Sequence, residues 1–66
     1  MYLKMELLEK LKTECTELSE KIVKLRFFLA GNKDELSKEE YALLTAQRYA
    51  MESYQSILRE RIKLYS

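Results

Sequence analysis

The sequence predicts an all-α protein, an antiparallel two-helix hairpin that oligomerises into a helical bundle. Three observations lead to this prediction. The 66 residues contain no proline and only one glycine, Gly31, which lies near the middle of the chain. Apolar residues recur at steps of three and four along both halves, the spacing that places them on one face of a helix. Between the halves, residues 31–37 are mostly polar and begin with the turn formers Gly31 and Asn32, as is typical of a short connection.

The first helix is predicted to cover about residues 3–30. Its apolar residues form one stripe along the helix: Leu8, Leu11, Cys15, Leu18, Ile22, Leu25 and Leu29. Gly31 follows directly, and a glycine in the left-handed conformation commonly ends a helix. The only cysteine, Cys15, lies on this stripe and cannot form an internal disulfide.

The second helix is predicted to cover about residues 38–65. Ser37 and Glu40 have the spacing of a capping box, in which each side chain accepts a hydrogen bond from the backbone N–H of the other residue. Leu36 and Tyr41 are placed to pack together across this cap. One broad face then collects the following residues: Leu43, Leu44, Gln47, Ala50, Met51, Tyr54, Ile57, Leu58, Arg61, Leu64 and Tyr65. The connection before this helix is short enough to make the two helices antiparallel neighbours.

Oligomerisation is expected because a single hairpin would leave much of this apolar surface in water. The apolar face of the second helix is wider than the stripe of about 100° that one neighbour covers. Near the end of the first helix, Val23, Phe27 and Phe28 point away from its apolar stripe. Burying a phenylalanine side chain contributes about 1.5–3 kcal/mol, which is large for so short a chain. We therefore expect a homo-oligomer, a dimer or larger, with a four-helix bundle as its smallest form.

Composition excludes several classes of function. With 12 basic and 11 acidic residues the net charge is +1, so nothing draws the chain to DNA. No apolar run reaches the ~18 residues that span a membrane, and the cytoplasm is the expected compartment. The chain has no histidine, its cysteine lies on the apolar stripe, and its only glycine ends a helix. We therefore expect no enzyme activity, no metal site and no cofactor.

Three polar residues on the second helix are the main candidates for ligand binding. Gln47, Tyr54 and Arg61 follow one another at steps of seven and share one side of the apolar face. A buried amide or guanidinium group needs a partner. These residues therefore form a polar layer that fixes the register of the bundle, lie at the rim with their polar ends in water, or line a pocket between subunits. In such a pocket Arg61 would bind an anion, Tyr54 would stack on a base or hydrogen-bond to it, and Gln47 would read the base edge.

A second group of candidates lies at the open end of the hairpin. Tyr2 and Lys4 on the first helix are expected near the basic last turns of the second helix. Cations mixed with tyrosines suit the phosphates and bases of a nucleotide. The alternative is simpler, because cations in the last turn of a helix also interact favourably with its dipole.

Two sets of residues form a pattern that extends over most of the chain. They are the run 36–44 with Gln47, Ala50, Met51, Tyr54, Ile57, Leu58, Arg61 and Ile62, and, in the first helix, Glu17, Leu18, Lys21, Ile22, Lys24, Leu25 and Phe28. This pattern resembles a family of very short phage-encoded helical-hairpin proteins. The hairpin is similar to that of the phage anti-CBASS and anti-Thoeris sponges, small helical oligomers that sequester immune signalling nucleotides.

The resemblance implies an anti-defence protein of the host cytosol. Such a protein would bind a cyclic oligonucleotide or an ADP-ribose-type signal between its subunits and would not cleave it. The residues alone leave two alternatives open. One is an inhibitor or adaptor of a host protein, acting through Val23, Phe27 and Phe28 or through the surface around Tyr49. The other is a purely structural bundle module.

Overall fold

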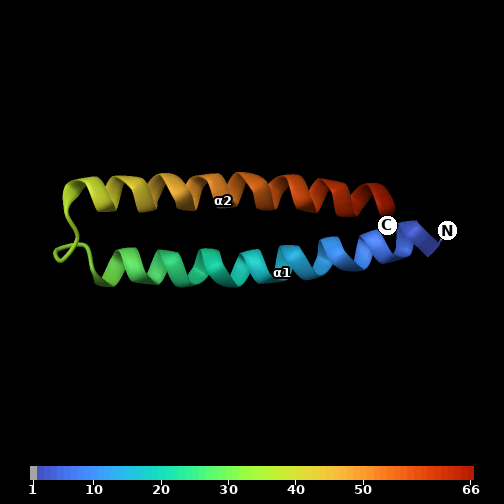
Figure 1. Cartoon of the computed structure of the whole chain (residues 1–66), viewed down its shortest axis with the longest axis horizontal. Helices are drawn as coiled ribbons and strands as arrows, with labels where there is room; N and C mark the ends of the chain where they lie inside the picture. Colours follow the sequence, from blue (N-terminus) through green and yellow to red (C-terminus); the bar gives the residue numbers. More distant parts are fainter. Residues whose placement is uncertain (1) are drawn as a thin grey trace.

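The computed structural model describes residues 2–66, with side chains from Leu3 onward. It contains two helices, α1 (Tyr2–Gly31) and α2 (Lys38–Tyr65), joined by residues 32–37. The helices lie side by side and antiparallel, so the two termini meet at one end of a rod of 51 × 14 × 13 Å and the loop closes the other (Figure 1). The predicted all-α hairpin is confirmed. Neither helix in the described part of the chain is long and apolar enough to cross a membrane.

The start of α2 has the predicted cap. The backbone N–H of Glu40 donates to Oγ of Ser37 at 3.1 Å, and the backbone N–H of Ser37 donates to Oε1 of Glu40 at 3.2 Å. This reciprocal pair satisfies two of the backbone donors that a helix leaves free at its start. It fixes the residue at which the chain turns back into α2.

The end of α1 differs from the prediction. Gly31 is the last residue of the helix, and no glycine of the described chain has a positive φ. The expected left-handed Gly31 is therefore wrong. Instead Asn32 donates to the carbonyl oxygen of Phe28 both from its backbone N–H and from its side-chain Nδ2, each at 3.0 Å. The asparagine side chain helps to satisfy the last turn, so no left-handed residue is needed there.

The predicted apolar stripe of α1 faces α2. Leu11, Ile22 and Leu29 are buried, and the other members of the stripe are half-buried. Because α2 is the only neighbour that the hairpin offers, this stripe is the core of a single chain.

The broad apolar face of α2 is divided by the structure. The residues that contact α1 recur at heptad spacing, and we call them the inner seam: Tyr41, Leu44, Arg48, Met51, Gln55, Leu58 and Ile62. Leu58 is completely buried, with an exposed fraction of 0%. Nε2 of Gln55 donates to Oγ of Ser19 in α1. The inner seam includes the polar residues Arg48 and Gln55. Apolar spacing alone could not identify them, so the sequence predicted the centre of the α2 face too far from α1.

Candidate functional site

A second stripe runs along α2 beside the inner seam. It also has heptad spacing, and each member precedes a residue of the inner seam or, in the last case, Tyr65: Leu43, Gln47, Ala50, Tyr54, Ile57, Arg61 and Leu64. We call it the outer stripe. A shift of one residue turns a side chain by about 100° around the helix, so α1 does not cover it. Leu43 and Leu64 keep exposed fractions of 72% and 80%. Most of the apolar face predicted for α2 is thus unpaired in a single chain.

Tyr54 is the one member of the outer stripe with a hydrogen bond to α1. Its hydroxyl donates to a carboxylate oxygen of Glu14. This hydrogen bond is the largest cause that raises the pKa of Tyr54; desolvation and the charge of Glu14 also raise it, and Arg61 lowers it. The phenol is therefore held in its neutral form. The contact also places the outer stripe on the side of the hairpin that carries Glu14.

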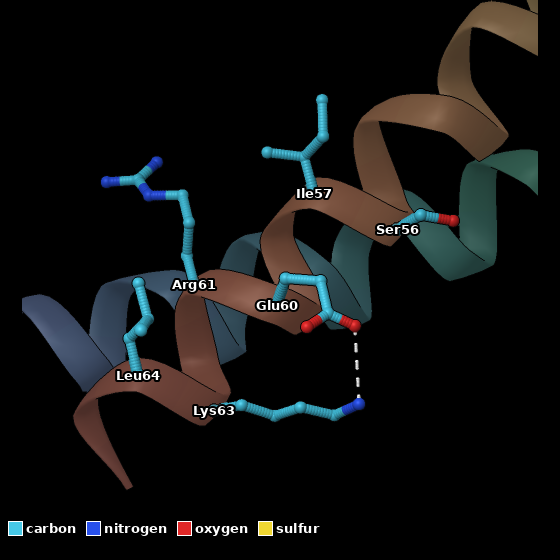
Figure 2. A pocket seen from close by; sticks show the side chains of 6 residues that line it. All are labelled: Ser56, Ile57, Glu60, Arg61, Lys63 and Leu64. Atoms are coloured by element: carbon cyan, nitrogen blue, oxygen red, sulfur yellow. Dashed lines mark hydrogen bonds and ion pairs between the residues drawn. The ribbon is translucent and has the colours of Figure 1, made fainter.

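Arg61 borders a shallow groove of about 490 Å³ that α2 alone provides. Its lining residues are Ser56, Ile57, Glu60, Arg61, Lys63 and Leu64. Figure 2 shows Ile57, Arg61 and Leu64 extending from one side of α2, with the Glu60–Lys63 ion pair along the other edge at 3.3 Å. In the described part of the chain Arg61 has no carboxylate partner of its own. Among the described residues only α2 lines this groove, so the groove lacks a wall on the side away from α2.

Gln47, Tyr54 and Arg61 share a face without forming one pocket. Residues seven apart on a helix are separated by about 10.5 Å along its axis. Gln47 is exposed, and Arg61 is half-buried. A single hairpin therefore presents the three predicted residues as a row and not as a closed site.

The predicted cluster at the open end is tested only in part. The side chain of Tyr2 lies outside the described residues. Lys4 is exposed, and Figure 1 places its end of α1 near the end of α2. The hydrogen bonds and ion pairs of the described residues do not join Lys4 to Arg61.

A pocket at the other end of the rod was not predicted. It has a volume of about 340 Å³ and lies between the last turns of α1 and the first turns of α2. We call it the loop-end pocket, and its lining residues are Arg26, Leu29, Ala30, Tyr41, Thr45, Arg48 and Tyr49. Although the sequence suggests that Arg48 and its neighbour Tyr49 both point away from the core, the Arg48 side chain keeps an exposed fraction of only 22%. The spacing of seven from Tyr41 to Arg48 to Gln55 was the signal that could have placed it on the inner seam.

Comparison with known proteins agrees with the resemblance seen in the sequence. The family described as Sequestin matches residues 5–64. This range includes the whole loop and all of both helices except their outer ends. No curated protein and no solved structure matches the chain. Because the family match extends over nearly all of the sequence, the chain belongs to the Sequestin family.

Proposed function

We propose that the protein sequesters an immune signalling nucleotide, a cyclic oligonucleotide or an ADP-ribose-type signal, in pockets between the subunits of a homo-oligomer. The outer stripe of α2 carries this proposal, because it alternates apolar residues with Gln47, Tyr54 and Arg61 and is joined to α1 in the described chain only by the Tyr54–Glu14 hydrogen bond. The name of the family supports sequestration. The protein would act in the cytosol of a phage-infected host, where removing the signal would counter the defence that depends on it.

The outer stripe is self-complementary when two copies of α2 pack antiparallel about a two-fold axis near Tyr54. In that register Leu43 lies opposite the partner's Leu64, and the small Ala50 lies opposite the partner's Ile57. A two-fold interface of this kind uses the same patch on both subunits. Pairing a small side chain with a large one allows two helices to approach closely.

The same register brings together the polar groups that one chain keeps apart. Gln47 lies opposite the partner's Arg61, so each dimer has two equivalent sites, one on either side of the paired tyrosines. The partner's α2 supplies the wall that the groove in Figure 2 lacks.

The chemistry of these residues fits binding without cleavage. A guanidinium can bind two phosphate oxygens at once, and the amide of Gln47 both donates and accepts, as recognition of a base edge requires. The ring of Tyr54 offers a surface for stacking. The hydroxyl of Tyr54 donates to Glu14, and this hydrogen bond raises its pKa, whereas an activated nucleophile needs a lowered pKa.

The test is native mass spectrometry of the purified chain, followed by thermal shift with a panel of cyclic dinucleotides, cyclic trinucleotides and ADP-ribose derivatives. We expect a dimer or larger assembly and a rise in Tm with at least one nucleotide. Arg61→Gln should raise the Kd for that nucleotide by about tenfold or more, since it removes a charge-assisted contact. Arg59→Gln, an exposed arginine outside the outer stripe, is the matched control. A monomer that binds no nucleotide of the panel would contradict the proposal.

The second candidate is an inhibitor or adaptor of a host protein. Its supporting observation is an exposed apolar patch on α1, where Val23, Arg26, Phe27 and Ala30 line a hollow of about 420 Å³. Phe27 keeps an exposed fraction of 74%. A dimer whose Tm is unchanged by every nucleotide of the panel would favour this candidate.

A further inference from the structure

We propose that the loop-end pocket is a second ligand site, complete within one chain, that binds the phosphate group of a nucleotide between Arg26 and Arg48. Arg26 comes from the end of α1 and Arg48 from the first half of α2, so the two helices of one hairpin supply both sides of the pocket. The groove beside Arg61 is different, because α2 alone lines it.

Two buried polar atoms on the pocket's residues have no hydrogen-bond partner among the described residues. They are Nε of Arg48 and Oγ1 of Thr45. The carboxylate paired with Arg48, that of Glu52, lies 3.7 Å from Nε, which is too long for a hydrogen bond. Leaving a buried donor unpaired is unfavourable. Both atoms are closed to an oxygen of water size, so a ligand that brings acceptor oxygens would satisfy them once the Arg48 and Thr45 side chains turn towards the pocket.

The charge of the pocket selects an anion. Two of its lining residues are arginines, and none of those lining it in the described chain is acidic. Cζ of Arg48 lies 4.7 Å from the centre of the Tyr49 ring, a cation–π contact that helps to hold the guanidinium in place. At the same end of the rod, Nζ of Lys33 lies 5.9 Å from the ring centre of Tyr41. A phosphate has the charge and the acceptor oxygens that this arrangement requires.

The surface next to the pocket suits the rest of a nucleotide. The hollow formed by Val23 and Phe27 shares Arg26 and Ala30 with the loop-end pocket, so the two are adjacent. A phosphate bound between the arginines would leave its nucleoside beside the exposed ring of Phe27, and bases stack on such rings. The volume of about 340 Å³ is within the range of small-molecule sites.

This site is separate from the one on the outer stripe. Arg48 and Arg61 are about 20 Å apart along α2. The loop-end pocket lies where α1 ends and α2 begins, whereas Arg61 lies in the last two turns of α2. The loop and the last turns of α2 are at opposite ends of the rod (Figure 1). The inference therefore does not depend on oligomerisation or on the proposed sites between subunits.

The experiment is a titration of the ¹⁵N-labelled full chain with AMP and, separately, with inorganic pyrophosphate, followed through the side-chain Nε–H signals of its arginines. We expect saturable shifts of the Arg26 and Arg48 signals. Arg26→Gln should raise the Kd for AMP about fivefold or more. Arg26 is exposed, so this variant keeps the core of the hairpin. Arg59→Gln is the matched control and should leave the Kd unchanged.

Arg61→Gln separates this inference from the proposed function. If Arg26→Gln weakens the binding of AMP and Arg61→Gln does not, the loop-end pocket is supported, whatever the outer stripe binds. If Arg61→Gln weakens the binding of AMP and Arg26→Gln does not, the loop-end pocket is refuted and the proposed function stands. The absence of saturable Arg26 and Arg48 shifts with both probes also overturns the pocket.

Discussion

The inner seam and the outer stripe run side by side along α2 and differ by one residue in register, yet only the inner seam lies packed against α1. Both mix apolar residues with an arginine and a glutamine at heptad spacing. In the inner seam Leu58 is fully buried and Gln55 is hydrogen-bonded to Ser19, because α1 lies against them. In the outer stripe Ile57, the neighbour of Leu58, keeps an exposed fraction of 56%. The difference lies in what covers each stripe, because α1 covers the inner seam and leaves most of the outer stripe exposed within one chain.

The largest expected effect comes from breaking the inner seam. Leu58→Ala removes the most deeply buried side chain of the hairpin and should lower the free energy of unfolding by about 2–5 kcal/mol. The matched change on the outer stripe, Leu43→Ala, should alter it by less than about 0.5 kcal/mol at low protein concentration, where association contributes least. Urea unfolding followed by circular dichroism measures both. Equal losses in the two variants would show that the two stripes are not distinguished within one chain.

The next effect comes from giving the outer stripe a charge. Ile57→Glu places a carboxylate in the surface that we propose for subunit contact, where it would lose its hydration opposite the partner's Ala50. We expect the dissociation constant of the oligomer to rise by more than about tenfold. Light scattering after size exclusion, over a range of concentrations, measures the change.

Val23→Glu is the control for this variant, because it places the same charge on an exposed apolar residue of α1. It should leave the oligomer unchanged. If Val23→Glu dissociates the oligomer and Ile57→Glu does not, subunits associate through the α1 patch and not through the outer stripe.

The comparison of the two stripes also explains how far the sequence could predict this structure. The α1 stripe from Leu8 to Leu29 and the cap at Ser37 were predicted correctly, because apolar spacing and capping chemistry are local properties of the chain. The division of the α2 face was not predicted, because both of its halves satisfy the same periodicity. Which half meets α1 is decided by the register of the two helices. That register depends on contacts such as Gln55–Ser19, which join residues far apart in the sequence.

The candidate sites follow the same rule. The row of Gln47, Tyr54 and Arg61 was visible in the sequence because its members lie on one helix. The loop-end pocket was not, because Arg26 and Arg48 become neighbours only when the hairpin closes. Nothing in the spacing of either helix alone marks them as a pair.

The smallest expected effect concerns Tyr54, the residue that links the outer stripe to α1. Its hydroxyl can donate to Glu14 only while it is protonated, so the pKa of Tyr54 in the folded chain lies above its ordinary value of 10.0. Since the folded-state pKa is the higher one, the stability that this hydrogen bond contributes is complete below pH 10.0 and is lost as the pH rises through the folded-state pKa. We therefore expect the Tm of the wild type to fall more steeply above that pH than the Tm of Tyr54→Phe, which has no proton to lose. The other four tyrosines are present in both proteins, so they cancel in the comparison. Thermal melts of both proteins from about pH 8 to about pH 11 measure the difference. If the two Tm curves are parallel, the Tyr54–Glu14 hydrogen bond does not stabilise the hairpin. The outer stripe then has no stabilising contact with α1 through Tyr54.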